Sequence, residues 1–542
     1  MTMVNPSSNG ASALASFSNS NGNGKIASPL LASTPTEEAI HAWLVEQLSQ
    51  RLELESQDID PDEDLTEYGL DSVEAVNLSG ELETFLGRRL PPTLLWDYPT
   101  LSALAEYLGN APADIASAMS PHRPSAVDLD EIPEEHYTFE LSPEYQELQG
   151  RLQQLEQSGL GNPFFQPQSG IVNNTTQIDG RELINFATYN YVGMSGDPAV
   201  SKAAVNAISQ YGTSVSASRL ISGEKPLHRE LEQEIASFIG TEDAIVLVGG
   251  HATNVTTISH LFGTGDLIVY DGLSHNSILQ GCQQSGASLL TFPHNDWNAL
   301  EALLADRRQN YRRVLIVIEG VYSTDGDIPD LPRFIELKKR YQTYLMVDEA
   351  HSIGVLGATG RGISEYFGIN PADVDLWMGT LSKSLASCGG YIAGSKAIVD
   401  YLKYTAPGFV FSVGISPPNA AATLAAIRTL KAEPERVARL RDRSRLFLTL
   451  AQEQDLNTGT SYDSPVIPII VGDDLKSVQL SRQLFVRGIN VPFMIYPSVP
   501  KGSARLRFFI TCDHTEAQIR KTVAILSEEV AKLNQPDSSA VA

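Results

Sequence analysis

The chain has 542 residues, of which 42% are hydrophobic and 19% charged, as in a folded protein too long for one ordinary domain. Its formal net charge of −26 argues against non-specific binding to nucleic acid. We find no membrane-spanning apolar run, no secretory signal, and only three cysteines without disulfide or metal-ligand spacing, so we expect a reducing, cytoplasmic setting.

Composition divides the chain into five segments. Residues 1–35 are rich in Ser, Asn, Gly and Ala and bury too little apolar surface to fold, which predicts a disordered tail. Residues 36–110 show helical periodicity, and residues 111–140 are rich in Ala, Pro, Ser and acids, which predicts a linker. Residues 141–535 alternate helices with short apolar strands and predict a large enzyme domain, and residues 536–542 predict a second tail.

The segment 36–110 predicts a small, acidic, all-helical module. It holds 17 Asp and Glu against 3 Lys and Arg, which suggests either a docking surface for basic partners or a merely solvated face. Asp71 and Ser72 lie where a loop gives way to an apolar helix. On its own, such a dipeptide is most often only an N-cap.

The surroundings of Ser72 favour a different interpretation. The run GLDSVEAVNLSGELETFLGRRLPPTLLWDYPTLSALAEYL resembles an acyl carrier protein of the modular polyketide synthase type. The resemblance implies a four-helix module in which Ser72 carries 4′-phosphopantetheine, whose thiol holds an acyl group as a thioester. It also implies two partners, a phosphopantetheinyl transferase and an upstream acyl-loading enzyme or synthase.

Five apolar runs in the large module read as strands, and helical stretches separate several of them. The alternation predicts a mostly parallel sheet covered by helices on both faces. Ligands bind beyond the carboxyl ends of the strands in such sheets, and polar motifs follow the strands there. The predicted strands are Ala244–Val248, Leu267–Tyr270, Val314–Ile318, Tyr344–Val347 and Leu376–Met378.

Two strand ends carry residues that suit pyridoxal phosphate. Asp348 follows one strand within Asp-Glu-Ala-His, a run that helicases share, but the helicase phosphate loop is missing from the sequence. Lys383 follows another strand among small hydroxyl residues, where it is a candidate Schiff-base amine rather than an ordinary surface charge. Pyridoxal phosphate needs a lysine for its aldehyde, an acid for its ring nitrogen and donors for its phosphate.

These motifs together resemble the α-oxoamine synthase family of fold-type I pyridoxal-phosphate enzymes, from about residue 185 to residue 515. The resemblance implies a homodimer whose subunit has a mostly parallel large domain and a small C-terminal α+β domain. It implies decarboxylative condensation of glycine or an L-amino acid with an acyl thioester, here on the chain's own carrier, giving an α-aminoketone. We expect a role in polyketide- or fatty-acid-derived natural product biosynthesis.

The family pattern implies the catalytic and cofactor-binding residues. Lys383 would hold the cofactor and later act as the base, while Asp348 would pair with the ring nitrogen. His351 would contact the ring hydroxyl, and His275 would stack on the ring. Further cofactor contacts are implied for Gly250, His251, Glu319, Ser323 and Thr380.

Asn190, Ser323 and Arg507 are the implied substrate-binding residues. Arg507 would bind the amino-acid carboxylate, because a guanidinium binds a carboxylate through two parallel hydrogen bonds. Arg505 lies two positions away and on a strand would point the same way, so only motif alignment favours Arg507. A surface ion pair is the alternative for either arginine.

Several alternatives remain open at this point. The segment Phe411–Pro418 has Val413 and Gly414 where relatives often carry hydroxyl residues, so the phosphate contact that it makes across the family's dimer interface stays open. The enzyme could catalyse aminotransfer or aldol cleavage beside a carrier that serves another enzyme, or use acyl-CoA as the donor. A non-catalytic loading or scaffolding module is the other rival. The sequence names neither the amino acid nor the acyl chain.

Overall fold

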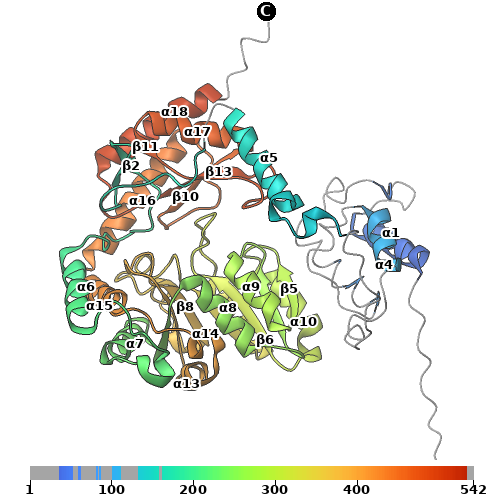
Figure 1. The fold of residues 1–542 in the computed structure, drawn as a ribbon, viewed down its shortest axis with the longest axis horizontal. Coiled ribbons are helices and arrows are strands. Elements are labelled where there is room, and N and C mark those ends of the chain that lie inside the picture. The colour runs from blue at the N-terminus through green and yellow to red at the C-terminus, as the bar shows by residue number, and fades with distance from the viewer. Residues whose placement is uncertain are drawn as a thin grey trace, which may run out of the picture. The chain divides into compact units, whose positions relative to one another are not determined.

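The computed structural model describes residues 36–52, 59–62, 78, 81–82, 85–86, 100–110, 132–157 and 162–533 (Figure 1). Ser72, both predicted tails and most of the predicted linker lie outside these residues. The described residues belong to two compact units. Among them, no helix combines the length and the apolar character needed to cross a membrane.

The small unit contains helices α1 (Glu37–Leu52) and α4 (Leu101–Asn110), which pack against each other. Each helix begins after a threonine whose hydroxyl accepts a backbone N–H, Thr36 from Ala39 and Thr100 from Ala103. The apolar positions at helical spacing are buried, as predicted: Ile40, Leu44 and Leu48 of α1, and Leu101, Leu104 and Leu108 of α4. Of the rest of the predicted four-helix module, residues 59–62, 78, 81–82, 85–86 and 100 are described, and residues 78, 81–82 and 85–86 are helical.

A seven-stranded mixed sheet forms the centre of the large unit, in the order β3-β9-β8-β7-β6-β4-β5. Only β9 runs antiparallel to its neighbours, so the prediction of a mostly parallel sheet is confirmed. The sequence did not predict β5 and β9. The strands are β3 (Asp243–Leu247), β4 (Leu267–Asp271), β5 (Ser288–Phe292), β6 (Val314–Glu319), β7 (Tyr344–Asp348), β8 (Leu376–Thr380) and β9 (Gly390–Gly394).

Helices cover both faces of this sheet, and side chains alternate between the two cores. On β7, Val347 packs into one core and Met346 into the other. The first core is covered by α7 (Pro226–Ile239), α10 (Trp297–Arg307), α11 (Leu331–Tyr341) and α15 (Pro417–Ala432). The second is covered by α8 (Gly250–Leu261), α9 (Asn276–Ser285) and α13 (Lys396–Thr405).

A smaller α+β subdomain contains the C-terminal part of the large unit, as predicted. Its sheet β10-β13-β12 is antiparallel, and a second sheet, β1-β2-β11, joins residues from both ends of the unit. The strands are β1 (Thr175–Ile178), β2 (Arg181–Asn185), β10 (Val466–Gly472), β11 (Ile489–Asn490), β12 (Phe493–Met494) and β13 (Ala504–Phe509). Helices α16 (Glu435–Glu453), α17 (Asp474–Val486) and α18 (Glu516–Leu533) cover them.

The remaining elements are short or peripheral. The helices are α5 (Pro143–Gln157), α6 (Pro198–Tyr211), α12 (Ile363–Phe367) and α14 (Pro407–Val410). Two single 3-10 turns, η4 (Glu134–His136) and η5 (Phe139–Leu141), lie at the end of the predicted linker. The domain boundaries given by the sequence remain predictions.

Candidate active site

The carboxyl ends of three neighbouring strands gather the charged residues of the site. β6 ends at Glu319 and β7 at Asp348, and these two residues are register partners. The next strand, β8, ends at Thr380, three residues before Lys383. Because these parallel strands point the same way, their ends meet at one edge of the sheet, where ligands bind in this class of fold.

Lys383 and His351 are in direct contact. The Lys383 Nζ lies 2.7 Å from His351 Nε2, and His351 Nδ1 lies 2.8 Å from the Tyr191 hydroxyl. Burial lowers the pKa of Lys383 to about 8, although the carboxylates of Asp348 and Glu319 raise it in part. Burial also lowers the pKa of His351 well below its ordinary value. An amine with this pKa can lose its proton near neutral pH and act as a nucleophile or base.

Asp348 is a buried carboxylate held by neutral donors. Its Oδ2 accepts from Asn254 Nδ2 at 2.8 Å and its Oδ1 from the Ala350 N–H at 2.9 Å. In the part of the chain that the structure describes, Asp348 forms no ion pair. A buried charge needs a cationic partner, and a protonated pyridine nitrogen fits that requirement.

His275 occupies the N-cap of α9 and leaves its ring exposed. Its N–H donates to Glu319 Oε1 at 2.6 Å, and its Nδ1 lies 2.7 Å from Ser277 Oγ. Ser277 Oγ also accepts from Asn254 Nδ2, so these bonds link His275 to Asp348. A fixed imidazole with an exposed ring suits stacking on an aromatic cofactor.

The start of α8 forms a place for a phosphate. A Cβ added to Gly250 would lie 2.7 Å from Thr380 Oγ1, so glycine is needed for the helix to approach β8 this closely. Gly250 and His251 occupy the first turn of this helix, whose backbone N–H groups suit a phosphate. The Thr380 hydroxyl lies beside them, 2.8 Å from Ser382 Oγ.

Arg505 and Arg507 occupy the same face of β13 but differ in their partners. Arg505 donates to Asp325 Oδ1 at 2.5 Å and is buried. Arg507 donates to the Ser323 carbonyl at 2.8 Å and lies over the Phe509 ring at 4.6 Å. Its buried Nε has no hydrogen-bond partner among the described residues. Arg507 therefore keeps donors for a carboxylate, whereas Arg505 already has one.

Asn190 is buried and hydrogen-bonded locally, and its role at the substrate carboxylate stays a prediction. Its side chain closes a local loop, because Oδ1 accepts from the Ser195 N–H at 2.9 Å and Nδ2 donates to the Ser195 carbonyl at 3.2 Å. Its two neighbours in sequence contact residues of the site. Tyr191 binds His351, and the Tyr189 ring centroid lies 5.4 Å from Lys383 Nζ.

Sequence reasoning missed Tyr189, Tyr191, Asn254 and Phe509. Asn254 follows Gly250 by one helical turn, and a polar side chain on that face was a usable signal. The tyrosines lie next to Asn190 in a segment without regular periodicity, which gave no signal for their orientation. Ser72 lies outside the described residues, and its role as attachment site remains a prediction.

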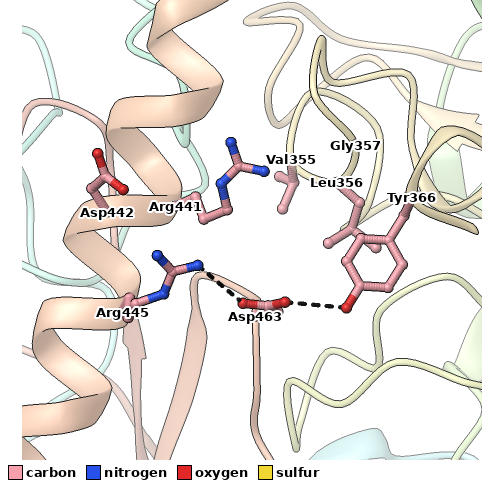
Figure 2. Close-up of a pocket in the computed structure, with 8 residues that line it drawn as sticks. All are labelled: Val355, Leu356, Gly357, Tyr366, Arg441, Asp442, Arg445 and Asp463. Atoms are coloured by element: carbon pink, nitrogen blue, oxygen red, sulfur yellow. Dashed lines mark hydrogen bonds and ion pairs between the residues drawn. The ribbon is translucent and has the colours of Figure 1, made fainter.

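A separate surface pocket of about 350 Å³ does not contain these residues (Figure 2). Within it, Asp463 accepts from the Tyr366 hydroxyl at 3.1 Å and lies 3.8 Å from Arg445. The pocket is lined by Val355, Leu356, Gly357, Tyr366, Arg441, Asp442, Arg445 and Asp463. The lining contains none of the residues described around Lys383, so this pocket is not part of that site.

Comparison with known proteins agrees with this geometry. The aminotransferase class I and II family matches residues 181–526, and the phosphopantetheine attachment site family matches residues 42–108. The 8-amino-7-oxononanoate synthase of Symbiobacterium thermophilum is 38% identical over 374 residues, covering 69% of this chain and 95% of the relative. The synthase of Geobacter sulfurreducens is 40% identical over 383 residues, covering 70% and 97%.

Solved structures agree with the sequence relatives. The serine palmitoyltransferase of S. paucimobilis, solved with bound pyridoxal phosphate and myriocin, superposes with a TM-score of 0.69 at 30% identity. That match covers 72% of this chain and 98% of the other chain. This chain therefore belongs to the α-oxoamine synthase family, as a pyridoxal-phosphate-dependent C-acyltransferase preceded by a phosphopantetheine-carrying domain.

Proposed function

We propose that the enzyme joins an amino acid to an acyl group held as a thioester on phosphopantetheine at Ser72. The products are an α-aminoketone, CO2 and the free carrier thiol. One observation carries this proposal, namely that a phosphopantetheine attachment domain and an α-oxoamine synthase share one polypeptide. Covalent tethering raises the local concentration of the acyl donor to about millimolar for a short flexible linker.

Each site residue has a separate role in the proposed reaction. Arg507 binds the carboxylate of the amino acid and thereby orients its Cα bonds. Lys383 removes the Cα proton, with its amine positioned by His351. When bound, pyridoxal phosphate supplies the electron sink that stabilises negative charge at Cα. Asp348 keeps the cofactor's ring nitrogen protonated, and Thr380 with the first turn of α8 binds the phosphate.

The bonds balance in the following way. A carbon–carbon bond forms between Cα and the acyl carbonyl carbon, and the carbon–sulfur bond to the carrier breaks. The thiolate takes up a proton, the carboxylate leaves Cα as CO2, and a proton, such as the one that Lys383 removed, takes its place on Cα. The order of acylation and decarboxylation is left open by this proposal.

The test uses the full chain, loaded with pyridoxal phosphate and acylated phosphopantetheine. We first titrate it with each common amino acid and follow the visible absorbance, which identifies the amino acid that binds. With that amino acid, CO2 and carrier thiol should appear in equal amounts. Aminotransfer would release an oxo acid without CO2, and aldol cleavage would release an aldehyde, so either product would refute condensation.

The source of the acyl group is tested by Ser72→Ala. The variant cannot be acylated and should lose turnover, while its binding of the amino acid should remain unchanged. Full turnover of the variant with free acyl-CoA would show that coenzyme A, and not the carrier, is the donor.

We also propose a cytoplasmic homodimer that works in polyketide- or fatty-acid-derived natural product biosynthesis. Its partners would be a phosphopantetheinyl transferase and an upstream acyl-loading enzyme or synthase. Exposed apolar side chains support the dimer, since Phe411 is 87% and Ile221 81% exposed in the single chain. Sedimentation of wild type and of Phe411→Ser measures the assembly, and a monomeric wild type would refute it.

A further inference from the structure

Tyr189 is an exposed side chain in a buried segment. It is 38% exposed, whereas Phe186, Tyr191 and Val192 on either side are fully buried. Phe186 packs in the core of the C-terminal subdomain, and Tyr191 in the main core. The Tyr191 N–H also donates to the Tyr189 carbonyl at 2.8 Å. The backbone of Tyr189 is therefore held from both ends, while its side chain stays partly exposed.

The Tyr189 ring lies against the site residues. Its centroid is 5.4 Å from Lys383 Nζ, within the range of a cation–π interaction. It meets the His351 ring edge-to-face at 5.8 Å and the Phe509 ring at 4.8 Å. The guanidinium of Arg507 lies over the same Phe509 ring at 4.6 Å. Tyr189 thus borders the space between the amine of Lys383 and the guanidinium of Arg507.

We propose that Tyr189 limits the size of the amino-acid side chain that the site accepts, an inference that rests on the proposed function. The substrate brings its amine to the position of the Lys383 amine and its carboxylate to Arg507. Its Cα, which is bonded to both, then lies beside the Tyr189 ring. An aromatic ring with few rotamers and a fixed backbone is a rigid wall. The ring therefore leaves room for a small side chain on Cα and excludes branched and longer ones.

The experiment compares Tyr189→Ala with two variants of the full, pyridoxal-phosphate-loaded protein. Tyr189→Phe keeps the ring, and Tyr137→Ala removes a tyrosine that is 70% exposed and outside the site. Calorimetric titration with glycine, alanine, serine, leucine and phenylalanine gives a dissociation constant for each. Removing the ring should improve the affinity for leucine relative to alanine by about 10-fold or more. Both comparison variants should keep the wild-type ratio.

Each result decides between the two proposals. Wild-type binding with an unchanged leucine-to-alanine ratio in Tyr189→Ala overturns the role of Tyr189 and leaves the proposed function standing. A changed ratio in Tyr189→Phe overturns it too, because the hydroxyl and not the ring would then discriminate. If wild type binds no amino acid, the proposed function fails and the inference with it. Tyr189→Val provides the same test if the alanine variant melts at a much lower temperature than wild type.

Discussion

The amine of Lys383 and the imidazole of His351 form a hydrogen bond whose direction depends on the charge of the lysine. The Nζ···Nε2 distance is 2.7 Å, and an ammonium can only donate, so Nε2 is the acceptor while Lys383 is protonated. In that state the proton of the neutral imidazole is on Nδ1, which donates to the Tyr191 hydroxyl oxygen at 2.8 Å. Burial keeps His351 neutral, because it lowers the histidine pKa well below the ordinary value. His351 therefore orients the lysine without competing for its proton.

Capture of pyridoxal phosphate by the apoprotein should follow the titration of Lys383. Only the neutral amine attacks the aldehyde, and burial lowers the pKa of Lys383 from 10.5 to about 8. The rate should rise with pH, reach half its maximum near pH 8 and level off above about pH 9. Stopped-flow absorbance between pH 6 and pH 10 measures it, with the apoprotein mixed with excess cofactor. A rate still rising steeply at pH 10 would mean that Lys383 has an ordinary pKa.

Substitution of Arg507 should weaken amino-acid binding, whereas substitution of Arg505 should mainly destabilise the fold. Arg507→Ala should weaken amino-acid binding about 30- to 100-fold, because it removes charge-assisted hydrogen bonds to the carboxylate. Arg505→Ala should leave binding nearly unchanged but destabilise the fold by about 3 kcal/mol, since Asp325 loses its buried partner. Calorimetric titration and thermal melting of both variants measure these effects. The assignment is wrong if Arg505→Ala weakens binding more than Arg507→Ala does.

Glu319 should act as a neutral hydrogen-bond acceptor. Burial, followed by the nearby charge of Asp348, raises the pKa of Glu319 well above its ordinary value, which favours the protonated carboxyl more than at an exposed glutamate. Glu319→Gln has the same shape and also accepts the His275 N–H, and should bind pyridoxal phosphate within about 3-fold of wild type. Glu319→Ala loses that bond and should bind about 5- to 10-fold more weakly. Fluorescence titration of the apoproteins compares them, and equal losses in both would show that the charge is required.

The residues that the chemistry requires were predictable, and their surroundings were not. Lys383 and Asp348 stand out because a cofactor of this kind needs an amine and an acid at strand ends, and the structure brings both to one edge of the sheet. Motif alignment alone favoured Arg507, because the strand pattern could not distinguish it from Arg505, which points the same way on β13. Asp325 distinguishes them, and it lies 180 residues away along the chain.

Local backbone geometry explains the other differences. Asn190 and Tyr189 are adjacent in a segment without regular periodicity, where the Tyr191 N–H donates to the Tyr189 carbonyl and turns the chain. Strand β9 was missed because glycines begin and end it, which weakens the apolar signal. Close packing requires the first of them, since a Cβ on Gly390 would lie 2.4 Å from Thr253 Oγ1. The sheet topology therefore depends on small residues that a search for apolar runs does not detect.

His294 should stabilise the loop that carries His275 in a pH-dependent way. It bridges Asp271 and Asp327, with both nitrogens 2.8 Å from a carboxylate oxygen. Burial would lower the pKa of His294, but hydrogen bonds and charge from the two carboxylates raise it to about 10. Because the pKa is raised on folding, the stabilisation is complete below about pH 6.5, declines above that and is lost as the pH passes 10.

The variant His294→Gln should therefore melt well below wild type at pH 6, with a loss of roughly 2–4 kcal/mol, and the difference should shrink toward pH 10. The matched control is His260→Gln, which removes a histidine whose pKa is lowered by burial and which hydrogen-bonds to the Thr405 hydroxyl and stacks on the Tyr401 ring. Its melting temperature should not approach that of wild type as the pH rises from 6 to 10. If the melting-temperature difference between His294→Gln and wild type stays constant across this range, the bridge stabilises the loop by packing and hydrogen bonding, and the imidazolium charge contributes nothing.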